Sequence, residues 1–184
     1  NGPSVSLSSP LTLSSQLYCQ SGVFTTNNHD VNTGSNFQIL VTQNATMTLN
    51  LGTSSITTSS YYYSYTRWST PSYGDLVMNN SQATYLFNGS NYSDESGRQG
   101  LQSDWKEIIT NKSNTSHINF YSYGDIAKLT QKGNGQIRLH QTSRNNGGPH
   151  GNNLTKIGYA EIKNSANFTG NVSFTTLKLQ GNGA

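Results

Sequence analysis

The chain has 184 residues, only 10% of which are Asp, Glu, Lys or Arg, and its formal net charge is +3. This length suits one domain with a sizeable core, and its single cysteine, Cys19, excludes an internal disulfide framework. No apolar run approaches the roughly 20 residues of a membrane span, and no basic run of the kind that follows phosphates is present, so we expect neither membrane insertion nor nucleic-acid binding.

Most of the chain is Ser, Thr, Asn, Gln, Gly and Tyr, including 18 Gly and 11 Tyr. Amides and hydroxyls exchange hydrogen bonds with a polyol, and aromatic rings pack against the C–H face of a sugar. The composition therefore indicates a recognition surface. Nine Asn-x-Ser/Thr sequons occur, which we attribute to the abundance of these residues; the alternative is a glycosylated secreted domain, although such domains commonly carry disulfides.

Short strands separated by polar turns are predicted along the chain. Residues 1–16 are expected to be an extended lead-in, because Pro3 and Pro10 disfavour helix. The strongest strand signal is the aromatic run 61–68. The other predicted strands cover residues 17–25, 37–42, 45–51, 76–78, 84–87, 118–123, 126–130, 136–141, 155–162 and 172–179.

Two segments bear on the fold class. Residues 128–137 are predicted to form a hairpin with its turn at residues 133–135. Residues 103–110 could form a helix capped by Ser103, but the run Ile108-Ile109-Thr110 favours strand, which we expect. About ten short strands with at most one short helix predict an all-β fold, a two-sheet sandwich or jelly roll in one domain spanning residues 1–184.

One tetrapeptide occurs twice. Ser-Tyr-Gly-Asp fills residues 72–75 and again residues 122–125. The repeat could mark a duplicated hairpin, but four common residue types are weak evidence, and coincidence is the better interpretation.

Four stretches, taken in order, resemble the rotavirus spike head, the lectin-like domain that proteolysis separates from the outer-capsid attachment protein. They are similar to its Asp-Gly-Pro entry, its aromatic-led Ile-Leu-Val strand, its Trp-Lys strand and its Gly-rich hairpin. In this chain they fill residues 1–3, 37–44, 104–108, and 133–137 running into 140–144. Ser143 replaces the family's Pro, and the Cys-bearing C-terminal helical tail is missing, so the resemblance is to a divergent rotavirus group.

The resemblance implies a galectin-like β-sandwich. It also implies synthesis in the host cytoplasm, display on the outer capsid of the virion, and two partners: a host cell-surface glycan and the remainder of the viral spike protein. The arginine that helps sialic-acid binders in this family corresponds here to Asn36. A neutral glycan is therefore expected rather than a salt-bridged sialic acid.

A second cleft segment of the family maps onto residues 144–151. On the strand before it, Arg138 and His140 are expected to share a face because they are two residues apart. The candidate glycan-binding residues are Asn36, Arg138, His140, Arg144, Asn145, Asn146 and His150. The alternative is a solvated Asn/Gly turn without a ligand. The aromatic run 61–68 is a second candidate platform, although core packing explains it better; Trp105 is likewise expected in the core.

Catalysis is not expected. Glycosidases need two carboxylates at ~5 to 9.5 Å, and the sequence identifies no such pair. Four His and one Cys show no zinc-ligand spacing, and Cys19 fits a small core residue better than a nucleophile, so neither metal nor cofactor is expected. The rival function is a structural trimeric fibre or tail tip that serves assembly or binds a protein receptor; a bacterial adhesin domain is a third alternative.

Overall fold

The structure is a computed structural model, and it describes residues 2–59, 62–65, 74–88, 104–111, 118–121, 125–134, 136–140, 155–164, 166–169 and 172–180. Within these ranges the chain forms β-strands and no helix, which confirms the all-β prediction. The strands are β1 (Ser4–Ser6), β2 (Leu11–Leu13), β3 (Leu17–Cys19), β4 (Gly22–Thr25), β5 (Val31–Thr33), β6 (Phe37–Leu40), β7 (Thr46–Asn50), β8 (Ser55–Thr58), β9 (Tyr62–Tyr65), β10 (Asp75–Asn79), β11 (Thr84–Phe87), β12 (Trp105–Thr110), β13 (Ile118–Tyr121), β14 (Ile126–Gln131), β15 (Ile137–His140), β16 (Thr155–Ile162), β17 (Ala166–Thr169) and β18 (Val172–Leu179).

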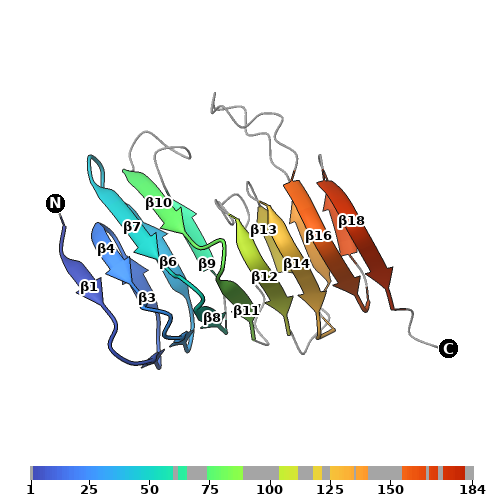
Figure 1. The fold of residues 1–184 in the computed structure, drawn as a ribbon, viewed down its shortest axis with the longest axis horizontal. Coiled ribbons are helices and arrows are strands. Elements are labelled where there is room, and N and C mark those ends of the chain that lie inside the picture. The colour runs from blue at the N-terminus through green and yellow to red at the C-terminus, as the bar shows by residue number, and fades with distance from the viewer. Residues whose placement is uncertain are drawn as a thin grey trace.

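The strand pairs of the described residues are all parallel, and each joins segments one turn of chain apart. Val31 lies opposite Ile56, which lies opposite Tyr85, the next turn along. The chain therefore forms a parallel β-helix, or β-solenoid, which we call the coil. Its successive turns stack, and its two ends lie at opposite ends of the molecule (Figure 1). An eight-stranded sheet, β18-β16-β14-β12-β11-β8-β5-β2, runs the whole length.

This topology corrects the expectation of a galectin-like two-sheet sandwich. Such a sandwich is built from antiparallel neighbours joined by tight turns, whereas here neighbouring strands come from successive turns of the coil. Strand length, alternation and polar turns are alike in the two architectures. For this reason the sequence pattern predicted strands without predicting their partners.

The hairpin predicted at residues 128–137 is wrong for the same reason. Strand β14 pairs with β12 and β16, while β15 pairs with β13 and β17, so the two strands belong to different sheets. The chain turns a corner of the coil near Gly133. Segment 103–110 is strand β12 from Trp105 onward, as expected.

The lead-in and the first predicted strand also differ from expectation. Residues 1–16 contribute β1 and β2 to the first turn of the coil, and segment 17–25 forms β3 and β4 instead of one strand. The break covers residues 20 and 21, and β4 then begins at Gly22, which has φ +94° and whose Cβ, if present, would lie 2.0 Å from the carbonyl oxygen of Pro3. Only glycine fits this close approach of two turns.

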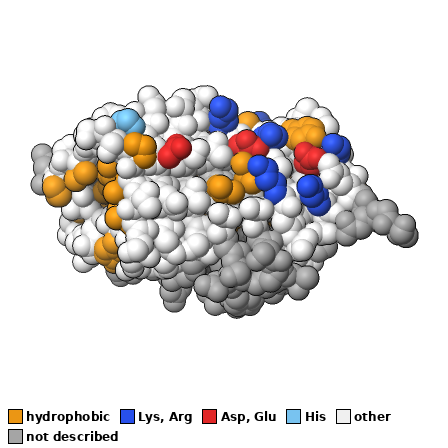
Figure 2. Space-filling model, turned by 90° about the horizontal axis from the view of Figure 1, so that it is seen from below, with side chains coloured by type: hydrophobic (Ala, Val, Ile, Leu, Met, Phe, Trp, Pro, Cys, Tyr) orange, Lys and Arg blue, Asp and Glu red, His pale blue; other side chains and the backbone are white. Residues whose placement is uncertain are grey.

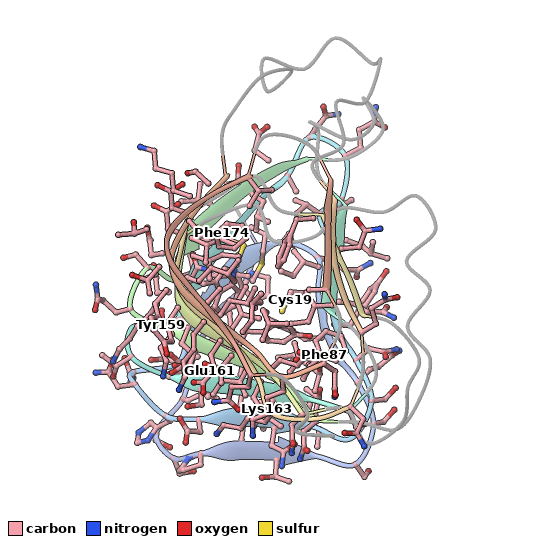
Figure 3. The ribbon with its side chains drawn as sticks, turned by 90° about the vertical axis from the view of Figure 1, so that its right-hand side faces the viewer. Cys19, Phe87, Tyr159, Glu161, Lys163 and Phe174 are labelled. Atoms are coloured by element: carbon pink, nitrogen blue, oxygen red, sulfur yellow. The ribbon has the colours of Figure 1, made fainter. Side chains whose placement is uncertain are left out.

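The core is a stack of apolar side chains inside the coil. Along the eight-stranded sheet, one interior row is aligned in register from the first turn to the last: Leu11, Val31, Ile56, Tyr85, Ile108, Leu129, Ala160 and Leu177. The six inner members are at most 1% exposed, whereas Leu177 in the last strand is 43% exposed. Figure 3 looks along the coil and shows Phe87, Cys19 and Phe174 inside it.

Cys19 lies in this core, as expected, and burial raises the pKa of its thiol from 9.0 to about 12. Its contribution to stability is thus fully present below pH 9 and is lost as the pH rises toward 12. We predict that a disulfide reagent at pH 8 does not label the folded protein and labels it fully in urea, because the thiolate is the reacting species. Equal labelling rates in both states would contradict this placement.

Candidate functional site

The structure places the sequence-predicted site residues on separate parts of the coil or leaves them outside the described residues. Arg138 and His140 lie on β15, opposite residues of β13 and β17. Asn36 precedes β6 in the other half of the coil and is 7% exposed, while its carbonyl oxygen accepts a hydrogen bond from the amide of Leu17 at 2.9 Å. The remaining four, Arg144, Asn145, Asn146 and His150, lie outside the described residues.

The aromatic run 61–68 is described only at β9, which pairs with β6. There Tyr62 lies opposite Phe37, and Tyr63 lies opposite Gln38. The rest of the run lies outside the described residues, so its use as a sugar platform stays a prediction.

A different feature stands out among the described residues: an open hollow of about 510 Å³ at the corner where β10 turns into β11. Ligand sites commonly measure about 300–1,000 Å³. Its amide and carboxylate side chains come from the ends of β7 and β10, the turn after β10, and the residue before β12: Asn50, Asn79, Asn80, Gln82 and Asp104.

The coil holds two of these amides in place. Asn50 lies opposite Thr25 on one side and Asn79 on the other, so the three residues form a row across successive turns. Asn79 Nδ2 donates to Asn50 Oδ1 at 2.7 Å, and Asn50 Nδ2 donates to Thr25 Oγ1 at 3.2 Å. The hollow lies at the end of this row of hydrogen-bonded side chains.

Asn80 lines the hollow and carries an unpaired polar group that is itself buried. The residue is only 2% exposed, and its side-chain Nδ2 has no hydrogen-bond partner within the described part of the chain. Its carbonyl oxygen accepts from the amide of Ala83 at 2.8 Å, which fixes the turn. Leaving a buried donor unpaired costs about 1–3 kcal/mol, so a ligand oxygen that reached this nitrogen would bind favourably.

Asp104 is the carboxylate that lines the hollow, and its Oδ1 accepts a hydrogen bond from the amide of Asp125 at 2.8 Å. No second carboxylate joins it among the lining residues described, so the hollow lacks the pair that glycoside hydrolysis needs. The described residues also contain no cluster of three or more His, Cys, Asp or Glu that could bind a metal ion. They contain no helix that is long and apolar enough to span a bilayer.

Sequence reasoning did not find this hollow. The sequence feature that could have indicated it is that three strands of successive turns each end in an Asn or Thr: Thr25, Asn50 and Asn79. That row is recognisable only once the coil is known, because unequal numbers of residues separate its members.

Comparison with protein-family models, with curated proteins and with solved structures finds no match to this chain. The features that bear on function therefore come from this structure alone. They are a parallel coil, an amide-lined hollow, and the carboxylate of Asp104, which accepts a hydrogen bond from a backbone amide.

Proposed function

We propose that this chain is a non-enzymatic attachment domain that binds neutral cell-surface glycans in the hollow at the β10–β11 corner. The observation that carries the proposal is the amide lining, above all Asn80, whose buried Nδ2 is unpaired within the described residues. Amide groups donate to and accept from sugar hydroxyls, and a ring hydroxyl is a suitable acceptor for Nδ2.

The charge of the lining favours a neutral ligand. The lining residues that the structure describes include no Lys, Arg or His, and Asp104 would repel a carboxylate or sulfate. This reason is independent of the family-based expectation at Asn36, which is buried and outside the hollow.

The setting of the proposal is the one that the rotavirus resemblance implies: a domain carried on the outer capsid as part of the spike protein, in many copies per particle. Several weak contacts then act together, so that one shallow site suffices. The parallel coil differs from the galectin-like sandwich that the resemblance implies, so the support for glycan binding comes from the hollow.

The test is a glycan array probed with the domain clustered on beads, so that weak binding registers. Asn79→Ala removes a lining amide, and we expect it to weaken the array hits about tenfold, the equivalent of ~1.4 kcal/mol. Asn32→Ala, an exposed amide on β5 away from the lining, is the matched control and should retain the hits.

The outcomes separate function from site. The glycan-binding function and its site in the hollow are both supported if neutral glycans bind, if Asn79→Ala weakens this binding, and if Asn32→Ala preserves it. Hits that survive in Asn79→Ala keep the glycan-binding function and move its site, first toward residues 138–150. An array without hits contradicts the proposal.

An assembly role is the second candidate, and one observation favours it. The large apolar side chains that are exposed among the described residues all lie on edge strands: Val5, Tyr18, Val77, Leu177 and Leu179 on β1, β3, β10 and β18. Exposed edges of parallel coils can pair with another chain. Light scattering distinguishes the two functions, because a fibre tip should be trimeric in solution and an isolated attachment head monomeric.

A further inference from the structure

The charge of this chain is divided unequally along the coil. Nine of its eleven Lys and Arg follow residue 105, together with only three of its eight acidic residues. Figure 2 shows blue side chains gathered toward the C-terminal half of the visible face. Such an asymmetry is a feature of proteins that bind a polyanion.

Four lysines of this half and one tyrosine lie on or directly after three neighbouring strands of the eight-stranded sheet, β14, β16 and β18. In β16, Tyr159, Glu161 and Lys163 lie on the outer side of the strand (Figure 3). Tyr159 lies opposite Lys128 of β14, and Glu161 lies opposite Lys178 of β18. We call the set Lys128, Lys132, Lys163, Lys178 and Tyr159 the lysine face.

The two glutamates of this face are already paired. Lys128 Nζ lies 2.9 Å from Glu107 Oε1, and Lys178 Nζ lies 3.3 Å from Glu161 Oε1. Burial alone would raise the pKa of Glu107, but hydrogen bonds from Lys128 and Thr130 and the charges of Lys128 and Lys132 together lower it. Each glutamate therefore compensates much of the charge of its lysine partner.

Two lysines form no ion pair within 4 Å among the described residues, Lys132 directly after β14 and Lys163 directly after β16, although the charge of Lys132 also acts on Glu107 at longer range. The turns that carry them are fixed: the amide of Lys132 donates to Thr110 O at 2.8 Å, and the amide of Lys163 donates to Gln131 Oε1 at 2.9 Å. They follow neighbouring strands of one sheet, and such strands are ~4.8 Å apart. Adjacent fixed cations of this kind suit a ligand with regularly spaced negative charges.

Tyr159 makes a saccharide the most suitable anion. The side chain is partly exposed, and the adjacent Gly158 carries no side chain. A Cβ on Gly158 would lie 2.6 Å from Ala127 O, so a larger residue does not fit there. Thr176, opposite Tyr159, is an exposed hydroxyl. A sugar ring of a polysaccharide can pack on the phenol while acidic substituents on sugars further along the same chain reach Lys132 and Lys163, which lie four residues, or ~13 Å, along the strands.

We infer that the lysine face binds an acidic polysaccharide, carrying sulfate or carboxylate groups, through Lys132 and Lys163 with a sugar ring against Tyr159. The lysines and Tyr159 do not line the hollow, so this interaction is separate from the neutral-glycan site and does not depend on it.

The experiment measures binding of fluorescent dextran sulfate, with unmodified dextran of equal length as the uncharged probe. The double variant Lys132→Gln/Lys163→Gln should bind dextran sulfate about tenfold more weakly, with a shallower salt dependence. Arg67→Gln/Arg98→Gln removes the same formal charge from the other part of the sequence and should change affinity less than twofold. Equal losses in the two double variants would overturn the inference, because net charge alone would then explain binding.

A second comparison tests the sugar contact. Tyr159→Ala should weaken dextran sulfate and leave inorganic polyphosphate unchanged, whereas Tyr159→Phe should retain both. Tyr159→Ala without effect on dextran sulfate, or single-stranded DNA or anionic vesicles binding more tightly than dextran sulfate, would overturn the assignment to a polysaccharide.

Discussion

Replacing Tyr85 by alanine should lower the free energy of unfolding by about 3–5 kcal/mol. Tyr85 is 1% exposed and occupies the middle of the interior row, between Ile56 and Ile108. Its ring centroid lies 5.2 Å from that of Phe87 and 5.6 Å from that of Trp105. Truncation leaves a cavity where turns of the coil stack, and each turn is stabilised chiefly by its neighbours.

The matched variant is Tyr85→Phe, which keeps the ring and removes the hydroxyl. That hydroxyl lies 2.8 Å from Thr58 Oγ1 in the interior, so its loss leaves a buried polar group unpaired and should cost about 1–3 kcal/mol. Urea unfolding with an unchanged m-value measures both variants. A loss below about 1 kcal/mol for Tyr85→Ala would contradict the central place of Tyr85 in the core.

Replacing Gln131 by leucine should cost about 1–3 kcal/mol for each of two backbone N–H groups that it leaves without an acceptor. Gln131 is completely buried, and its Oε1 accepts from the amides of Lys163 and Asn164, both at 2.9 Å. This single side chain thus ties the turn after β16 to the preceding turn of the coil. Leucine is close to glutamine in size but cannot accept either bond.

Hydrogen exchange provides the specific readout for Gln131→Leu. The amides of Lys163 and Asn164 should exchange faster in the variant, while those of β4 and β7 at the other end should not change. Gln20→Leu is the control, because Gln20 is exposed and its replacement should stay within about 0.5 kcal/mol of the parent. Unaltered exchange at residues 163 and 164 would show that Gln131 does not hold the turn.

Strand positions were predictable from local sequence, and strand partners were not. The predicted segments 84–87, 155–162 and 172–179 coincide with β11, β16 and β18. Alternating apolar residues between polar turns favour a strand whichever other strands it pairs with. Pairing depends on which segments share a register across a full turn. The spacing varies from 17 residues between Ala160 and Leu177 to 31 between Leu129 and Ala160, so no fixed repeat length was visible.

The repeated Ser-Tyr-Gly-Asp illustrates the same difficulty. Its final residue begins β10 in the first copy, Asp75, and directly precedes β14 in the second, Asp125. Each of these strands pairs with the preceding turn, so neither copy begins a strand of an antiparallel hairpin. Four residues were too few to reveal that each copy begins or directly precedes a strand that pairs with the preceding turn of the coil.

The hollow could not be predicted from the sequence, because its lining residues come from different turns of the coil. Asn50 and Asn79 are 29 residues apart and meet only through the register of β7 and β10, and Asp104 arrives from before β12. The general expectation of an amide-rich recognition surface came from composition. The particular residues required the fold, and Asn36, taken from the family resemblance, is buried elsewhere.

The most direct test of the proposed attachment function is side-chain amide NMR during titration with the neutral oligosaccharide that gives the strongest array signal. We expect the NH₂ resonances of Asn79 and Asn80 to shift saturably, while that of Asn32 on β5 does not shift. Shifts confined to other residues, or no shift at a concentration that saturates the bead-bound domain, would contradict a glycan site in this hollow.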